Sequence, residues 1–176
     1  MPGDTGEAVS ATRIGFTGTS QELTDVQFLS LGFVLQNLKK AGAEELHHGC
    51  CVGADYTAHE MGQALGYKIV KHPPDNTCKM AECIGGEEWK PKPYLDRNHD
   101  IVDATVMLVA APKERHEQLR SGTWATVRYA TKKNRPITFV WPDGSVTTCE
   151  INKGAVNELP YSKESVKEPG SQTGSR

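Results

Sequence analysis

The amino-acid sequence predicts an α/β fold: a three-layer sandwich with helices on both faces of a mainly parallel sheet. Short β-prone runs alternate with segments of helical periodicity along most of the chain. The connections between them are short and marked by glycine, as is usual between a strand and its crossover helix. The most apolar run, "TVMLVAAP" at 105–112, has the composition of a strand buried on both faces. We therefore expect about five strands, with this run as a central one.

The first predicted helix has a start signal and an apolar period. Thr24 can accept a hydrogen bond from a backbone N–H of the first turn, and Gln27 stands where its capping-box partner would be. The helix follows a β-prone run at 13–17 and is expected to stop at Ala41–Gly42. Its apolar residues recur near helical spacing and are Val26, Leu29, Phe33, Val34 and Leu38.

The later elements continue the alternation with one interruption. Residues 75–93 are polar and rich in Gly, Pro and Lys, so we expect a long loop that is functional or mobile. "PDGS" at 142–145 is a turn signal, which predicts a C-terminal β-hairpin around it. The other predicted elements are strands at 44–49, 67–74, 105–112 and 136–141 and helices at 55–66, 94–104 and 122–134.

Length and composition limit the class of protein. The 176 residues suffice for one well-buried domain, which we place at 13–160 between a flexible N-terminus (1–12) and a disordered tail (161–176) of low hydrophobicity. A formal net charge of −2 gives no global basic field for nucleic acid or membrane binding. The sequence shows no secretory signal and no run approaching the roughly 18 apolar residues of a membrane span. We therefore expect a cytoplasmic protein without membrane partners.

Reactive residue types are densest in "HHGCCVGADYTAH" at 47–59. The cysteine count of five is odd, and the adjacent Cys50 and Cys51 are poorly placed to bridge each other, so we expect reduced thiols. His47 and His48 fall on opposite faces of a strand and cannot share one ion. We expect no metal and no cofactor, although one looser set without an evident fourth ligand stays open: His72, Cys78 and Cys83.

Three glycine-containing junctions each follow a predicted strand. In parallel α/β sheets ligands bind at the carboxyl ends of the strands, where helix N-termini present free N–H groups to an anion. We therefore expect the junctions to face one crevice and to hold the phosphate of a ligand. Their residues are Gly18, Thr19 and Ser20, then Gly49, Gly53, Ala54 and Asp55, and finally Ser121, Gly122 and Thr123.

Two charged residues near these junctions each have a functional and a structural interpretation. Asp55 could contact a ribose or a base, or it could be the N-cap of the following helix. Arg97, followed by Asn98, precedes a predicted strand and could reach across the strand ends to a phosphate or carboxylate. The alternative for Arg97 is a surface salt bridge with Asp96 or Asp100.

Four motifs occur in a recognisable order over roughly residues 13–141: "GFTGTS", "HHGCCVGADYTAHEMGQALGYKIV", "YLDRNHDIVDATVMLVAAP" and "RSGTWATVRYATKKNRPI". Together they resemble the SLOG superfamily, which joins the Rossmann-like domain of DprA/SMF proteins with the Lonely Guy (LOG) phosphoribohydrolases. The resemblance implies a Rossmann-like nucleotide-binding fold, a ligand phosphate at the glycine-rich helix starts, and a homodimer or higher homo-oligomer.

The chain departs from the LOG pattern at one position. LOG enzymes carry a catalytic glutamate in a Gly-Gly-x-Gly-Thr-x-x-Glu motif, and alignment on Gly122–Thr123 puts Thr126 in its place. Hydrolysis of an N-glycosidic bond would then need Asp55, Asp96 or Asp100, and Arg97 and Asp55 are the catalytic candidates. Our leading interpretation is a stand-alone SLOG domain that binds a nucleotide-like small molecule, with a nucleoside monophosphate N-glycosidase as the alternative.

Binding of single-stranded DNA, as in DprA proteins, is a less favoured alternative. It would use a local basic patch and the aromatic rings of Trp124 and Tyr129 for stacking. The near-neutral total charge weakens this interpretation, and DprA proteins usually have flanking domains that do not fit in this chain. The basic residues of the patch are Arg120, Arg128, Lys132, Lys133 and Arg135.

Overall fold

A seven-stranded sheet runs through the molecule in the order β4-β3-β2-β1-β5-β6-β7. The structure, a computed structural model, describes residues 12–150. The expected disordered tail and the expected flexible N-terminus lie outside these residues, except for Thr12, which begins the first strand. The three-layer α/β fold is confirmed. The strands are β1 (Thr12–Gly18), β2 (Ala43–His48), β3 (Lys68–Lys71), β4 (Glu87–Glu88), β5 (Met107–Ala111), β6 (Ile137–Val140) and β7 (Val146–Cys149).

All neighbouring strands pair in parallel except the last two. β7 runs antiparallel to β6, and the expected C-terminal hairpin is present, with the Trp141 N–H donating to the Ser145 carbonyl at 2.9 Å. β1 is the central strand, and the apolar β5 lies beside it. β4 was not expected, because two glutamates inside the polar excursion carry no strand signal, yet they pair in parallel with the end of β3.

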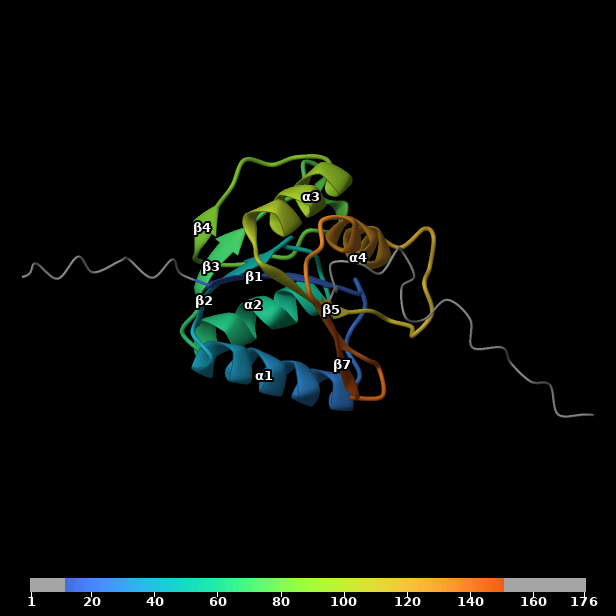
Figure 1. The fold of residues 1–176 in the computed structure, drawn as a ribbon. Helices are drawn as coiled ribbons and strands as arrows, with labels where there is room; N and C mark the ends of the chain where they lie inside the picture. The colour runs from blue at the N-terminus through green and yellow to red at the C-terminus, as the bar shows by residue number, and fades with distance from the viewer. Residues whose placement is uncertain (1–11, 151–176) are drawn as a thin grey trace, which may run out of the picture.

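Two helices cover each face of the sheet (Figure 1): α1 (Asp25–Lys40) and α2 (Ala54–Ala64) on one side, α3 (Tyr94–Ala104) and α4 (Gly122–Lys132) on the other. A short 3-10 turn, Thr77–Lys79, lies in the excursion. Among the described residues no helix combines the length and apolar character of a membrane span. Apolar side chains fill both helix–sheet interfaces, which leaves the loops at the carboxyl ends of the parallel strands free to form a site.

Helix α1 has the expected period but a different buried face. Thr24 caps it as expected and accepts from the Gln27 N–H at 3.1 Å. The Gln27 side chain does not close a capping box; its amide donates to the Pro112 and Val140 carbonyls at 3.0 and 2.8 Å inside the core. Packing on the sheet sets the rotation of the helix, so the buried residues are Gln27, Leu31, Val34 and Leu35, while Val26, Leu29 and Phe33 are exposed.

Candidate functional site

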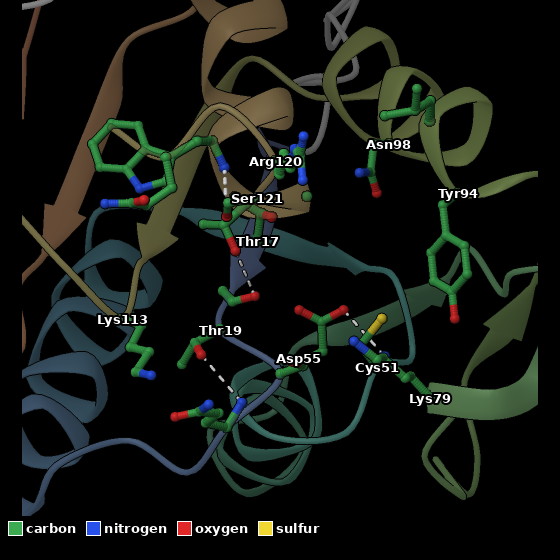
Figure 2. A pocket seen from close by; sticks show the side chains of 18 of the residues that line it. Thr17, Thr19, Cys51, Asp55, Lys79, Tyr94, Asn98, Lys113, Arg120 and Ser121 are labelled. Atoms are coloured by element: carbon green, nitrogen blue, oxygen red, sulfur yellow. Dashed lines mark hydrogen bonds between the residues drawn. The ribbon is translucent and has the colours of Figure 1, made fainter. Parts of the chain in front are cut away.

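A crevice of about 510 Å³ opens at the carboxyl ends of the central strands. Its volume lies within the range of small-molecule sites, roughly 300–1,000 Å³. Nine of the twelve residues expected to form the site line it, and the three that do not are Gly49, Gly53 and Ala54. Figure 2 shows the Asp55 carboxylate in the middle, between Lys113, Arg120 and Ser121 on one side and Tyr94, Cys51 and Lys79 on the other.

The second junction, Gly49–Asp55, which we call the packed turn, is held together from within. Asp55 is not the N-cap of α2; that position belongs to Gly53, and Asp55 lies in the first turn. One carboxylate oxygen of Asp55 accepts from the Gly49 and Cys51 N–H groups at 3.0 and 3.2 Å. Burial raises the pKa of this carboxyl, against the opposing effects of the Arg97 charge and the two backbone donors. These two backbone N–H groups of the packed turn therefore bind Asp55 and are not available to a ligand.

Glycines at the first two junctions serve close packing. Gly53 has a φ of +84°, and a Cβ there would meet the backbone of residues 19–21 at 2.5 to 2.7 Å. A Cβ on Gly18 would lie 2.4 Å from the Ala54 Cβ. The Ala54 N–H donates to the Thr19 carbonyl at 2.9 Å, so it is not offered to a ligand. These glycines bring two loops into contact, whereas the sequence suggested that they admit an anion.

Arg97 is buried beneath the packed turn and makes no surface salt bridge. Its Nη1 donates to the His72 carbonyl at 3.2 Å and its Nη2 to the Cys51 sulfur at 3.0 Å. A Cβ on Gly49 would lie 1.4 Å from Arg97 Nη1, so glycine is required to make room for the guanidinium. Asp100, the expected alternative partner, pairs with Lys92 instead, at 2.6 Å.

Asn98 lies one position further along α3 and points its amide into the crevice (Figure 2). Its side chain is buried, and no residue in the described part of the chain hydrogen-bonds to that amide. A primary amide offers both donors and an acceptor. Asn98 can therefore both donate to and accept from a polar group in the crevice.

The third junction, Ser121–Thr123, which we call the open helix start, has space in front of it. The Ser121 hydroxyl caps α4 by accepting from the Trp124 N–H at 3.4 Å, and the Thr123 hydroxyl donates to the Gly18 carbonyl at 2.7 Å. A Cβ on Gly122 would meet no atom of residues 12–150 within 4 Å. The positive end of the α4 dipole therefore faces the crevice across a residue without a side chain.

Three cationic side chains line the crevice without ion-pair partners among residues 12–150: Lys79, Lys113 and Arg120. Of these, only Arg120 was singled out from the sequence. Lys79 lies in the irregular excursion and gave no signal, whereas Lys113 could have been found, because it follows the end of β5 almost directly. Together with Arg97 they outnumber the two carboxylates that line the crevice, Asp55 and Glu114.

Comparison with solved structures places this fold among known ones. A molybdenum cofactor binding protein from Rippkaea orientalis is similar at 18% identity and a TM-score of 0.60, over 76% of this chain and 78% of that one. The molybdenum cofactor carrier protein of Chlamydomonas reinhardtii is similar at 17% identity and a TM-score of 0.53, over 73% and 76%. DprA from Streptococcus pneumoniae is similar at 18% identity and a TM-score of 0.56, over 73% of this chain but 50% of that one.

No protein-family model matches the sequence, and no curated protein does. The likeness to the solved structures therefore concerns the fold. The chain shares the fold of these structures. The mainly parallel sheet agrees with the Rossmann-like fold that the sequence resemblance implies.

Thr126, which the motif alignment puts in place of the LOG glutamate, lies in the core. It is 1% exposed, and its hydroxyl donates to the Gly122 carbonyl at 2.9 Å, so it offers no base to a ligand. Of the three carboxylates that could replace the glutamate, only Asp55 lines the crevice. Acid–base chemistry by a carboxylate at this site therefore depends on Asp55 or on Glu114, which the sequence did not single out.

The expected DNA-stacking face is not assembled as the sequence suggested. Trp124 is 1% exposed and packs among Phe139 and Trp141, so it cannot stack on a base. The Tyr129 ring stacks on His99 with 3.7 Å between centroids. Two of the five patch cations pair with carboxylates: Arg128 with Glu117 at 2.7 Å and Lys133 with Asp103 at 3.3 Å.

The looser metal set left open by the sequence is not brought together. Cys78 is exposed at the crevice, whereas His72 and Cys83 are buried, and these three donors form no cluster. His47 and His48 do face opposite sides, since His47 contacts His72 at 2.9 Å and His48 contacts His59 at 3.0 Å.

Proposed function

We propose that this chain is a SLOG-type binding domain for a phosphate-bearing, nucleotide-like small molecule held in the crevice. One observation carries the proposal: three cations without ion-pair partners in the described structure, Lys79, Lys113 and Arg120, line the same crevice as the open helix start. Placing like charges around a cavity is unfavourable unless an anion compensates them. A charge-assisted hydrogen bond contributes about 1.5–3 kcal/mol, and an exposed helix N-terminus about 0.3–1 kcal/mol.

The two sides of the crevice suggest the orientation of the ligand. The phosphate fits beside Lys113, Arg120 and Gly122, where the α4 N-terminus faces the open space. The heterocycle then lies toward Tyr94 on the opposite side, within reach of the Asn98 amide. Asp55 repels a phosphate, so it belongs next to a ribose hydroxyl or a base donor.

Two ligand classes share this chemistry. A nucleotide carries a phosphate on a purine or pyrimidine nucleoside, and the molybdenum cofactor, named for two of the similar structures, carries one on a pterin. Both therefore offer an anionic end to the cations and a flat heterocycle to Tyr94 and Asn98. Mass spectrometry of small molecules released by denaturing the purified protein distinguishes a nucleotide from a pterin by mass.

Calorimetry with a panel of nucleotides and cyclic dinucleotides tests the binding site. Gly122→Val should abolish binding while leaving the protein folded, because the added side chain enters the crevice and meets no protein atom at its Cβ. Lys132→Ala, at the far end of α4 and exposed, is the matched control and should bind as the wild type does. Unchanged affinity in folded Gly122→Val, or a bound anion elsewhere, would overturn the assignment.

Hydrolysis of a nucleoside monophosphate is the second candidate, favoured by the buried Asp55 carboxyl and its raised pKa at the crevice. We expect binding without turnover, because Thr126 replaces the glutamate and Asp55 already accepts two backbone N–H groups. Chromatography of reaction mixtures would show free base if this expectation is wrong. Multiple-turnover release that disappears in Asp55→Asn would establish the enzyme.

Two partners that the sequence resemblance implies, a second copy of this chain and single-stranded DNA, stay predictions. Sedimentation velocity tests the homodimer or higher homo-oligomer that the SLOG resemblance implies. Single-stranded DNA binding, if it occurs, should weaken steeply with salt as counterions are released, and fluorescence anisotropy at two salt concentrations measures this. A flat salt response would remove the DNA interpretation.

A further inference from the structure

A second group of reactive side chains lies behind the packed turn and takes no part in the crevice. One ring nitrogen of His48 and the thiols of Cys50 and Cys83 lie within 4.8 Å of one another, and all three residues are buried. They come from distant segments: His48 ends β2, Cys50 follows in the packed turn, and Cys83 lies in the excursion between β3 and β4. The Ala81 N–H donates to the Cys50 carbonyl at 2.8 Å, so backbone pairing holds the two segments together.

A chain of hydrogen bonds fixes which nitrogen of His48 carries the lone pair. The Ile84 carbonyl can only accept, so His59 donates to it from Nε2 at 3.0 Å and keeps a bare Nδ1. His48 Nε2 then donates to that Nδ1 at 3.0 Å. The Cys50 N–H donates to His48 Nδ1 at 3.1 Å, so Nδ1 carries the lone pair. A ring whose Nδ1 accepts a hydrogen bond while its Nε2 donates one is neutral imidazole. Neutral imidazole with an oriented second nitrogen is the form that ligates metals.

We propose that His48 Nδ1, Cys50 Sγ and Cys83 Sγ form a buried binding site for a thiophilic cation, either Zn²⁺ or Cu⁺. Two sulfurs and one imidazole nitrogen are donors that both ions prefer. In a tetrahedral zinc site, bonds of about 2.0–2.3 Å put neighbouring donors about 3.5–3.8 Å apart, so small side-chain rotations suffice. The cost is two hydrogen bonds: the one from the Cys50 N–H to His48 Nδ1 at 3.1 Å, and the one between the Cys50 and Cys83 thiols.

Binding of the ion releases protons from the two thiols. Each thiol transfers its proton to solvent as its sulfur binds the ion, so two protons are released, while neutral His48 loses none. The ammonium of Lys71 donates to the Cys83 carbonyl at 3.1 Å and lies near the two sulfurs, although it also pairs with Glu88 at 2.9 Å. Cys83 is 8% exposed and is the open side from which an ion would enter. The site does not depend on the ligand of the crevice.

Metal titration of the reduced full chain tests the site, with Zn²⁺ and Cu⁺ in separate arms and a chromophoric chelator as competitor. We expect one ion per chain, and at least a 100-fold loss of affinity in Cys50→Ser and in Cys83→Ser. His59→Gln, which removes the ring that orients His48 without removing a ligand, should lose about 10- to 100-fold. Cys51→Ser is the matched control: it is the adjacent thiol, but it contacts Arg97, and its metal affinity should equal that of the wild type.

Co²⁺ substitution gives a readout that does not depend on protein stability. Two thiolate ligands should produce a strong near-ultraviolet charge-transfer band, which each serine variant of the cluster should reduce and Cys51→Ser should retain. Circular dichroism establishes that each variant is folded before titration. No stoichiometric binding of either ion, binding that Cys51→Ser removes equally, or a Cys50–Cys83 disulfide in protein purified with reductant would overturn the proposal.

Discussion

The packed turn and the open helix start look alike in sequence but are built for different purposes. Both place glycine after a strand and before a helix. In the packed turn, Asp55 takes up two backbone N–H groups, and a Cβ on Gly49 would overlap the Arg97 guanidinium. In the open helix start, a Cβ on Gly122 would meet nothing within 4 Å. A glycine at a strand–helix junction therefore indicates either close protein packing or access for a ligand, and the space around its Cβ separates the two.

The largest expected contrast comes from the same substitution at the two glycines. Gly49→Ala places a Cβ 1.4 Å from Arg97 Nη1 and must displace a buried guanidinium, so we expect the free energy of unfolding to fall by at least about 3 kcal/mol. Gly122→Ala meets no atom and should change it by less than about 1 kcal/mol, toward greater stability. Urea denaturation followed by circular dichroism measures both, and equal losses would contradict the distinction.

The sequence predicted the elements of this fold well because their signals are local. The 94–104 helix, the Thr24 cap and the hairpin at "PDGS" all follow from residues within a few positions of one another. The site was predicted in part. Which glycines pack and which stay open depends on contacts such as Gly49 with Arg97, 48 positions apart in the chain. Lys79 and Cys83 lie in an excursion without periodicity, so only the tertiary structure reveals what they face.

The residues around the packed turn should also make the stability of the fold sensitive to acid. His72, whose carbonyl accepts from Arg97, is 1% exposed, and burial is the main cause that lowers its pKa from 6.5 to about 3. Its folded-state pKa lies below the unfolded value, so the unfolded chain binds more protons between these limits. The contribution of neutral His72 to the free energy of unfolding is therefore complete above pH 6.5. It is lost as the pH falls toward 3, at about 1.4 kcal/mol per pH unit.

Urea denaturation of the wild type and His72→Gln from pH 7 to 4 measures this loss. The variant should have a shallower slope by about 1.4 kcal/mol per pH unit, and the remaining slope reflects His47 and His48, whose pKa values burial also lowers. Asp55 acts in the opposite direction, because its raised pKa makes the folded state bind more protons above about pH 4. Asp55→Asn should therefore steepen the loss toward acid, and identical slopes in all three proteins would contradict these assignments.

Near the open helix start, Arg120 and Arg128 provide a matched test of where the phosphate binds. Arg120 lines the crevice and has no ion-pair partner in the part of the chain that the structure describes, whereas Arg128 pairs with Glu117 at 2.7 Å. Arg120→Ala should weaken binding of the best ligand in the nucleotide panel by about 10- to 100-fold, the equivalent of a lost charge-assisted hydrogen bond. Arg128→Ala should leave the affinity unchanged. Calorimetry measures both, and an equal effect of the two would move the phosphate away from Arg120.

The smallest expected effect separates the helix-capping role of Ser121 from contact with the ligand. Ser121→Ala removes a cap whose hydrogen bond is long, 3.4 Å, so we expect a loss of about 0.5 kcal/mol in unfolding free energy, at the low end for caps. Ser121→Asp keeps a capping oxygen and adds a negative charge that the helix N-terminus favours, so its stability should match or exceed that of the wild type. The same charge faces the crevice and should abolish binding of a nucleotide. Retained affinity in Ser121→Asp would show that the anion does not lie at the start of α4.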